Sequence, residues 1–169
     1  MTISLFSFVE MFDRVLDTAS HILTKGAEHA RATGAAEAEI LAWRLIEDMQ
    51  PLAFQIMVLC NFTRQWPARV AGLPLPGDFD VNLDVDGFQA AIAEAKSYLS
   101  ALTSEHFEDR DAVELTVTIG TGMSPTLPAA RWLTGFVTTN LYFHMSMAYA
   151  ILRAEGVPIG KPDLFPSGL

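Results

Sequence analysis

Residues 137–155 read VTTNLYFHMSMAYAILRAE, and this stretch decides the fold. Its apolar residues form two stripes at helical spacing, Leu141, Met145, Ala148 and Leu152 in one and Phe143, Met147 and Ile151 in the other. A helix that is apolar on more than one side is buried against several neighbours. Gly156 ends the pattern, and Pro158 follows just beyond it. The stretch therefore predicts the buried last helix of a helical bundle.

Three earlier segments have the apolar spacing of amphipathic helices. They cover about residues 4–31, 49–70 and 85–103. Together with the last helix over 137–155, they predict a mainly α chain folded as a four-helix bundle. The length of 169 residues fits one domain, spanning 1–169.

Caps and breakers refine these limits. Gly34 is the expected stop of the first helix. Asp48 is the expected N-cap of the second, with Pro51 in its first turn, and Pro67 should kink or end that helix early. Asp84 is the candidate N-cap of the third helix.

Residues 113–127 depart from the helical pattern. Glu114 to Ile119 alternate with a period of two, which indicates a strand, and the Gly120-Thr-Gly122 turn predicts a small β-hairpin. A lone hairpin must pack against the bundle to be stable. The breaker-rich tail after Gly156 should lie extended over the surface.

Composition restricts partners and location. The net charge of −9 disfavours nucleic acid and anionic membranes, because both attract positive proteins. No apolar run is long enough to span a membrane, and the first residues lack the features of a signal peptide. The single cysteine, Cys60, lies in an apolar run and is expected to be a core residue. We therefore expect a cytoplasmic protein.

Asn140 and His144 are the polar pair of the last helix. They lie four residues apart on one face, between the two apolar stripes. A buried amide and imidazole each need a partner, and Gln55 interrupts an apolar stripe of the second helix. Two interpretations remain open: a ligand or metal site in the bundle core, also lined by Phe54 and Tyr142, or a polar network that fixes the register of the helices.

Other chemistry has little support. The chain contains no CxxC, HExxH or P-loop motif and no glycine-rich dinucleotide fingerprint. Residues 77–87, GDFDVNLDVDG, look like a calcium loop but lack the closing glutamate, and Asp84 already serves as a cap.

Two segments resemble a known family. Residues 140–164, NLYFHMSMAYAILRAEGVPIGKPDL, and residues 48–55, DMQPLAFQ, are similar to an uncharacterised bacterial domain-of-unknown-function family of the DinB/YfiT-like superfamily. The resemblance covers essentially the whole chain. It implies a DinB/YfiT-like four-helix bundle with a small β-hairpin before the last helix. Members of that superfamily include metalloenzymes that use low-molecular-weight thiols.

The superfamily often holds a divalent metal with three histidines, one on the second helix and two on the last, four residues apart. By resemblance, His144 matches the second of the spaced pair, Asn140 falls on the first, and Gln55 falls near the helix-two histidine. The implied cofactor is zinc or nickel at His144 with Gln55 and Asn140, yet two of the three imidazoles are amides here.

Two functions follow as hypotheses. The first is a small-ligand binding or regulatory module with a degenerate metal site, its pocket lined by Phe54, Gln55, Asn140, Tyr142 and His144. The second is a metal-dependent thiol transferase or hydrolase of the DinB-like kind, in which a metal at His144 activates a thiol or water. In either case, the apolar last helix could pack across a two-fold axis, and a homodimer is expected.

Overall fold

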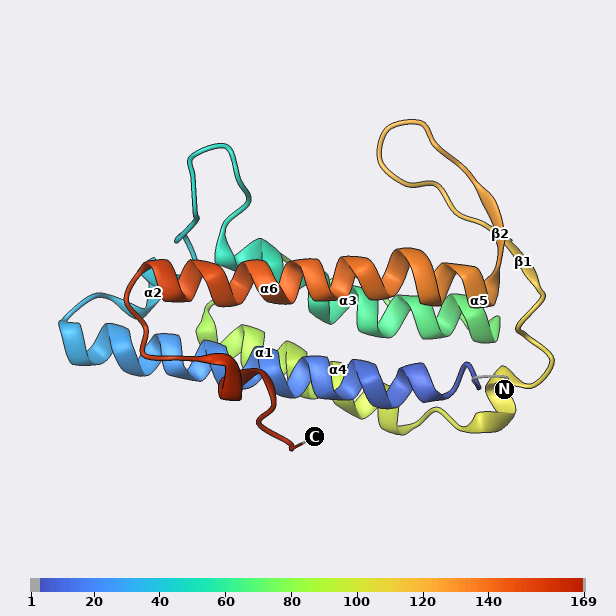
Figure 1. Cartoon of the computed structure of the whole chain (residues 1–169), viewed down its shortest axis with the longest axis horizontal. Coiled ribbons are helices and arrows are strands. Elements are labelled where there is room, and N and C mark those ends of the chain that lie inside the picture. The colour runs from blue at the N-terminus through green and yellow to red at the C-terminus, as the bar shows by residue number, and fades with distance from the viewer. Residues whose placement is uncertain (1–3, 169) are drawn as a thin grey trace.

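A computed structural model describes residues 4–168, and within them four long helices form a bundle (Figure 1). These are α1 (Ser7–Thr33), α3 (Leu52–Ala71), α4 (Val85–Ser100) and α6 (Thr138–Ala154). The shorter elements are α2 (Glu37–Ile40), strands β1 (Glu114–Thr116) and β2 (Thr126–Pro128), α5 (Ala129–Arg131) and 3-10 turns at Ser104–Phe107 and Lys161–Leu164. The mainly α fold with a small hairpin before the last helix is confirmed.

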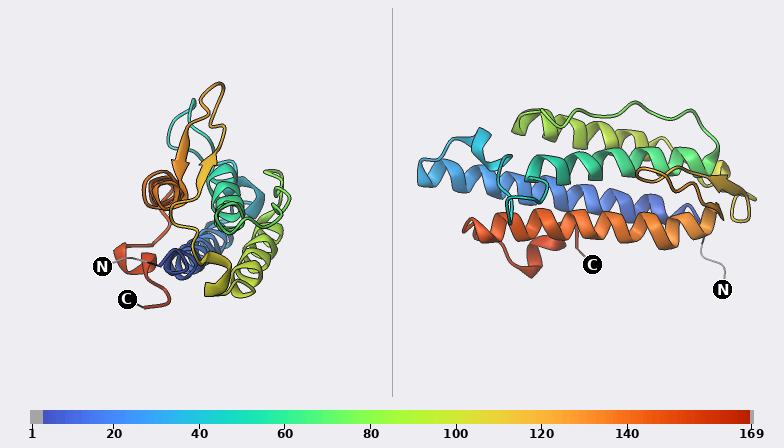
Figure 2. Two further views of the ribbon diagram at one scale, coloured as in Figure 1. Left: turned by 90° about the vertical axis from the view of Figure 1, so that its right-hand side faces the viewer. Right: turned by 90° about the horizontal axis from the view of Figure 1, so that it is seen from above.

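The four helices run in two directions. Helices α1 and α6 run one way and α3 and α4 the other, so the connection 72–83 must return along the length of the bundle (Figures 1 and 2). Helix α6 packs against α1 and α3, and α4 packs against the same two helices on the other side. Helix α6 therefore has one flank on α3 and another on α1.

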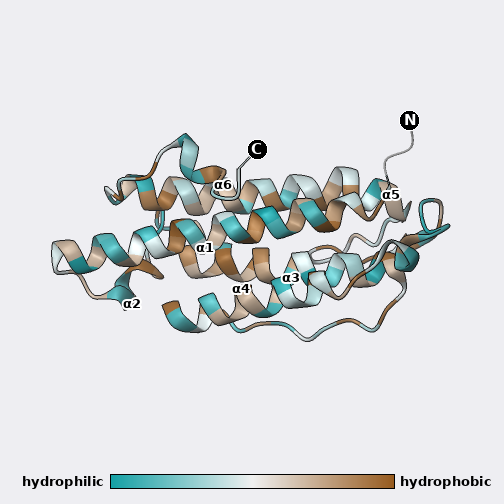
Figure 3. Cartoon of the chain, turned by 90° about the horizontal axis from the view of Figure 1, so that it is seen from below, coloured by the Kyte–Doolittle hydropathy of each residue, from teal (hydrophilic) through white to brown (hydrophobic). Residues whose placement is uncertain are grey.

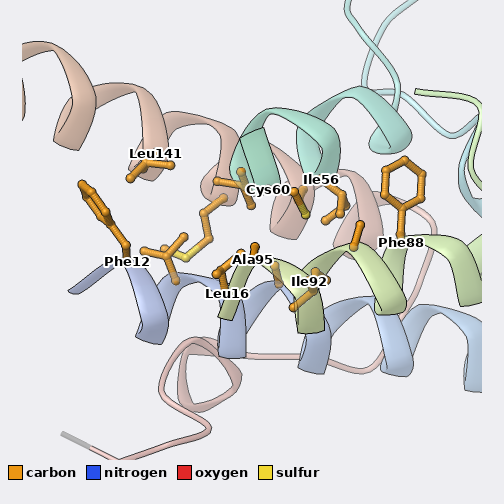
Figure 4. Packing of buried hydrophobic residues seen from close by; sticks show 14 of the residues in the cluster. Phe12, Leu16, Ile56, Cys60, Phe88, Ile92, Ala95 and Leu141 are labelled. Atoms are coloured by element: carbon orange, nitrogen blue, oxygen red, sulfur yellow. The ribbon is translucent and has the colours of Figure 1, made fainter. Parts of the chain in front are cut away.

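The core lies where the apolar stripes of the helices meet (Figure 4). Phe12, Leu16, Ile56, Ile92 and Leu141 are all at least 98 % buried. Burying a side chain of this size contributes about 1.5–3 kcal/mol. Hydrophilic residues take the outer positions, as the mixed colours along α1 show (Figure 3). Among residues 4–168, no helix combines the length and apolar character that a bilayer crossing requires.

The last helix begins earlier than the sequence indicates. Helix α5 starts at Ala129 and passes through a π-helical turn, Trp132–Val137, directly into α6. A π turn shifts backbone hydrogen bonds and leaves carbonyls to be satisfied by other donors. The Thr138 hydroxyl donates to the carbonyl oxygen of Leu133 at 2.7 Å. The expected start at residue 137 is therefore the last residue of this turn. Residues before it do not follow the apolar spacing of an α-helix, because the π turn changes the number of residues per turn.

The start of α3 also differs from the prediction. Pro51 is the N-cap and Leu52 the first helical residue, so the helix begins after residue 49 and Asp48 does not cap it. Pro67 does not end the helix, which continues to Ala71. Its fixed φ is helical, and its ring is buried, so the loss of one backbone hydrogen bond is tolerated.

The other two caps agree with the prediction. Gly34 ends α1 in the left-handed conformation, with φ 79°. The Asp84 carboxylate accepts a hydrogen bond from the backbone N–H of Gly87 at 2.7 Å and caps α4.

The hairpin and the tail are both tied to the bundle. Strands β1 and β2 pair antiparallel with Leu115 opposite Leu127, and the Trp132 indole donates to the carbonyl of Leu115 at 2.9 Å. The tail crosses back along α1 (Figure 1). It is not extended throughout, because it contains the turn Lys161–Leu164, where Asp163 contacts His21 of α1 at 2.7 Å.

Candidate functional site

The centre of the candidate site is a hydrogen bond between α3 and α6. Nδ1 of His144 lies 2.8 Å from Oε1 of Gln55. Gln55 is in the first turn of α3 and is 98 % buried. The sequence prediction that Gln55 answers the polar group of the last helix is thus met by the geometry for His144.

A second hydrogen bond orients the Gln55 amide. Its Nε2 donates to the backbone carbonyl of Gln50 at 2.9 Å. A carbonyl only accepts, so the oxygen end of the amide must face His144. Because that oxygen also only accepts, Nδ1 of His144 carries the proton. The Gln50 carbonyl therefore determines, through Gln55, which tautomer His144 adopts.

Burial keeps the imidazole neutral. Desolvation lowers the pKa of His144 below its ordinary value of 6.5. In the neutral ring with Nδ1 protonated, Nε2 has a free lone pair. Within residues 4–168, Nε2 has no hydrogen-bond partner, and it is not enclosed by the protein. His144 thus presents a single acceptor, which can take a hydrogen bond, remove a proton or bind a cation.

Two phenylalanines flank this imidazole. The ring of Phe54 lies 6.0 Å from the His144 ring, centroid to centroid, and the ring of Phe143 lies 5.2 Å from it at an angle of 85°. Phe143 is 51 % exposed. Phe54 was expected from the sequence to line the site, but Phe143 was not, because at its spacing Phe143 belongs to an apolar stripe.

Asn140 does not join the pair. Its Nδ2 donates to the carbonyl of Phe136, one turn earlier, at 2.7 Å. That carbonyl lies in the π-helical turn, so the Asn140 side chain is hydrogen-bonded to the backbone of this turn. The shared face of Asn140 and His144 is present, but no hydrogen bond links Asn140 to Gln55 or to His144 within the described chain.

Tyr142 lies on a different flank of α6. It lines a cavity between α1, α6 and the tail, together with Met145 and Ser146. Two residues of helix rotation separate it from His144, which faces α3. The structure therefore brings together Phe54, Gln55 and His144 and places Tyr142 at a second location.

The residues between α3 and α6 do not fit a three-histidine metal centre. Zinc and nickel sites need imidazole, thiolate or carboxylate donors, and His144 is the one such group in the pair. The Gln55 oxygen is already accepting the Nδ1 proton, and Asn140 is turned to the backbone. Across residues 4–168, no cluster of three or more His, Cys, Asp or Glu side chains is close enough to hold a metal ion.

Cys60 supplies no thiol chemistry nearby. It is fully buried in the core, and this desolvation raises the pKa of its thiol to about 12. A thiol with this pKa is protonated at neutral pH and is a poor nucleophile.

The arrangement of the helices, and not the residues between α3 and α6, is similar to that of a DinB family structure. A crystal structure of a DinB family member protein from Shewanella denitrificans has a TM-score of 0.84 and 25% identity to this chain, covering 93% of this chain and 88% of that one. The chain belongs to the family described as Domain of unknown function (DUF1993), whose model matches residues 6–165. The comparison with curated proteins gives no match.

Proposed function

We propose that this chain is a small-molecule binding module that uses the DinB-like bundle without a metal. The ligand would bind next to His144, at the position that a metal ion occupies in three-histidine members of the superfamily. The observation that carries the proposal is the hydrogen-bond chain from the Gln50 carbonyl through Gln55 to His144, which leaves Nε2 as an open acceptor.

The amides favour this proposal over an intact metal centre. An imidazole at position 55 would offer a lone pair to a cation, whereas the Gln55 amide consumes its oxygen on the Nδ1 proton. The Gln55 amide thus fixes one tautomer of His144. A fixed tautomer is useful for recognising a hydrogen-bond donor, because the acceptor needs no rearrangement when the ligand arrives.

The surroundings indicate the class of ligand. Phe54 and Phe143 provide apolar surface next to a neutral ring. A neutral molecule with an apolar body and one hydroxyl, thiol or amine donor matches these groups. A cation has less support, since within residues 4–168 His144 belongs to no group of three or more His, Cys, Asp or Glu side chains that could hold one.

Imidazole NMR tests this proposal with phenol as the probe and toluene as its matched control. We expect phenol to shift the ¹⁵N resonance of His144 Nε2 and toluene to leave it unchanged, because toluene lacks the donor. The Gln55→Leu variant should bind phenol more weakly, because leucine cannot accept the Nδ1 proton of His144 and the ring is then free to carry its proton on Nε2 instead. Equal shifts with both probes, or an Nε2 that is already protonated, would contradict the proposal.

The second candidate function is a metal-dependent enzyme of the DinB-like kind. One observation favours it: His144 keeps an imidazole at the matched position, with an accessible Nε2. Metal analysis of untagged protein separates the two functions. A stoichiometric metal that disappears in His144→Ala supports the enzyme. A metal-free protein whose melting temperature is unchanged by a chelator supports the binding module.

A further inference from the structure

A cavity of about 480 Å³ lies between α1, α6 and the C-terminal tail, away from the α3 flank that holds His144. This volume is within the range of about 300–1,000 Å³ typical of small-molecule sites. Its walls are largely apolar, with Met11 and Val15 from α1, Met145 from α6, and Leu164 and Phe165 from the tail.

Two aromatic side chains border this cavity without being covered. Tyr142 is 44 % exposed and Phe165 is 45 % exposed, and each comes from a different wall. Large exposed aromatic side chains that line a cavity are typical of ligand contacts.

The polar groups of the cavity divide into those already bonded and those available. The Thr18 hydroxyl donates to the carbonyls of Arg14 and Leu164, and the Ser167 hydroxyl donates to Asp17. Within residues 4–168, the side chains of Glu10, Arg14, Tyr142 and Ser146 make no hydrogen bond or ion pair. These available groups supply one anion, one cation and two hydroxyls.

The two charges of the cavity lie one helical turn apart. Glu10 and Arg14 are at positions i and i+4 of α1, so their Cβ atoms are about 5–6 Å apart and their charged ends reach a common ligand. The nearby carboxylates are otherwise engaged, since Lys96 contacts both Asp13 and Asp17. A ligand whose only charge is a carboxylate would be repelled by Glu10. A ligand whose only charge is an ammonium group would be repelled by Arg14.

We infer that this cavity is a second binding site, one that takes a small zwitterion with an apolar side chain, of the class of an apolar α-amino acid. Its carboxylate pairs with Arg14 and its ammonium group with Glu10. Its side chain packs among Met11, Met145 and Phe165. The Tyr142 and Ser146 hydroxyls, from the facing helix, are placed to donate to the carboxylate.

The tail holds its wall of the cavity in place. Besides the bond from Thr18 to Leu164, Asp163 contacts His21 at 2.7 Å, and its other carboxylate oxygen accepts from the Gly160 N–H at 2.7 Å. Hydrogen bonding to His21 lowers the pKa of Asp163, so that contact involves the carboxylate form. The wall formed by Leu164 and Phe165 is therefore fixed before a ligand binds.

Methyl NMR of the full chain, labelled at methionine methyls, tests the site with L-phenylalanine as the probe. We expect the Met11 and Met145 resonances to shift in a saturable manner, while Met57 on α3, which does not line the cavity, stays unchanged. Two analogues divide the charges: 3-phenylpropionate lacks the ammonium group and phenethylamine lacks the carboxylate. Each should bind at least tenfold more weakly than L-phenylalanine.

Charge variants complete the test. Glu10→Gln and Arg14→Gln should each weaken L-phenylalanine binding at least tenfold, whereas Glu155→Gln and Arg131→Gln, at exposed positions outside the cavity, should not change it. Both target side chains are exposed, so the variants should fold. Absence of a shift at Met11 and Met145, or equal affinity for L-phenylalanine and 3-phenylpropionate, would overturn the inference.

Discussion

Two oxygen atoms, which can only accept hydrogen bonds, determine which nitrogen of the His144 ring carries the proton. The Gln50 carbonyl takes the amide N–H of Gln55, and the Gln55 oxygen then takes the proton of His144 Nδ1. The ring nitrogen left over is the one that reaches solvent. A single change at residue 55 would therefore alter both the orientation and the proton state of the imidazole.

The half-buried His144 should make the stability of the protein depend on pH in a defined direction. Burial lowers the pKa of His144 below 6.5, so the unfolded chain binds the proton first as the pH falls. Above pH about 6.5 neither state is protonated there and stability does not change. Below that pH, stability falls until the pH passes the folded pKa, and then the loss stops.

Urea unfolding of the wild type and of His144→Gln, at a series of pH values from about 8 to about 5, measures this effect. The stability advantage of the wild type over the variant should be constant at the upper end and shrink at the lower end. An advantage that grows as the pH falls would show that the folded protein prefers the protonated ring and that the neutral tautomer is wrong.

Adding imidazoles at positions 55 and 140 should create a metal site with His144. We expect Gln55→His combined with Asn140→His to bind about one zinc or nickel ion per chain, because three imidazoles at these positions suit both metals. The Asn140 change also removes its bond to the Phe136 carbonyl, which costs about 0.5–1.5 kcal/mol. Elemental analysis of untagged protein measures the metal. The two single variants are the controls, and a double variant with no more metal than these would exclude the arrangement.

Contacts between polar side chains that interrupt an apolar pattern could be predicted from the sequence. Hydrogen bonds from side chains to backbone carbonyls could not. The intrusion of Gln55 and His144 into apolar stripes predicted that they meet. Nothing in the spacing of Asn140 indicated that its partner is the Phe136 carbonyl, because the π turn that contains this carbonyl has no periodic signature. The sequence grouped Tyr142 with His144, whereas Tyr142 lines the cavity beside α1, since an exposed position between two flanks can face either.

At the scale of elements, the long connection 72–83 depends on α3. Arg64 is 96 % buried, and its Nη2 donates to the carbonyl of Gly77 at 2.7 Å. Its Nη1 contacts Glu94 of α4 at 2.9 Å, and its guanidinium lies 3.7 Å from the centre of the Phe79 ring. Asn61 adds a hydrogen bond with the backbone N–H of Phe79 at 2.8 Å. The connection can therefore run the length of the bundle and still be fixed.

Replacing Arg64 should release this connection. We expect Arg64→Met to lower the free energy of unfolding by about 1–3 kcal/mol, because it leaves the Gly77 carbonyl without its charged donor. Limited proteolysis should then cut within residues 72–83 faster than in the wild type, and chemical denaturation gives the energy. Glu94→Gln is the matched control. Glu94 is largely exposed, so losing its charge should cost at most about 1 kcal/mol. A larger cost for Glu94→Gln than for Arg64→Met would show that the ion pair, and not the carbonyl, fixes the connection.

The limits of the helices show how far sequence patterns reach at this scale. Gly34 and Asp84 act locally, so the end of α1 and the start of α4 were predictable. The start of α3 and the continuation past Pro67 depend on how α3 packs, and propensity alone gives the wrong answer there. The same holds for α5 and the π turn, whose residues carry no single period.

For the molecule as a whole, α6 is the element that links the two candidate sites. One flank presents His144 to α3, and the other presents Tyr142 and Met145 to the cavity beside α1. The packing of α6 against both α1 and α3 explains why its sequence is apolar on more than one side. Phe143, whose ring lies beside His144, forms an outer side of α6 and is 51 % exposed.

That outer side leads to the expectation of a homodimer, with α6 packing across a two-fold axis. An aromatic ring exposed at the centre of a long helix is favourably buried when a second copy covers it. Light scattering after gel filtration should give twice the chain mass of 18.5 kDa for the wild type. We expect Phe143→Asp to give a monomer with the helical content unchanged. Leu75→Asp, an equally exposed apolar residue on the connection 72–83, should remain dimeric. A wild-type mass of one chain, or dissociation caused equally by both changes, would exclude a dimer formed through α6.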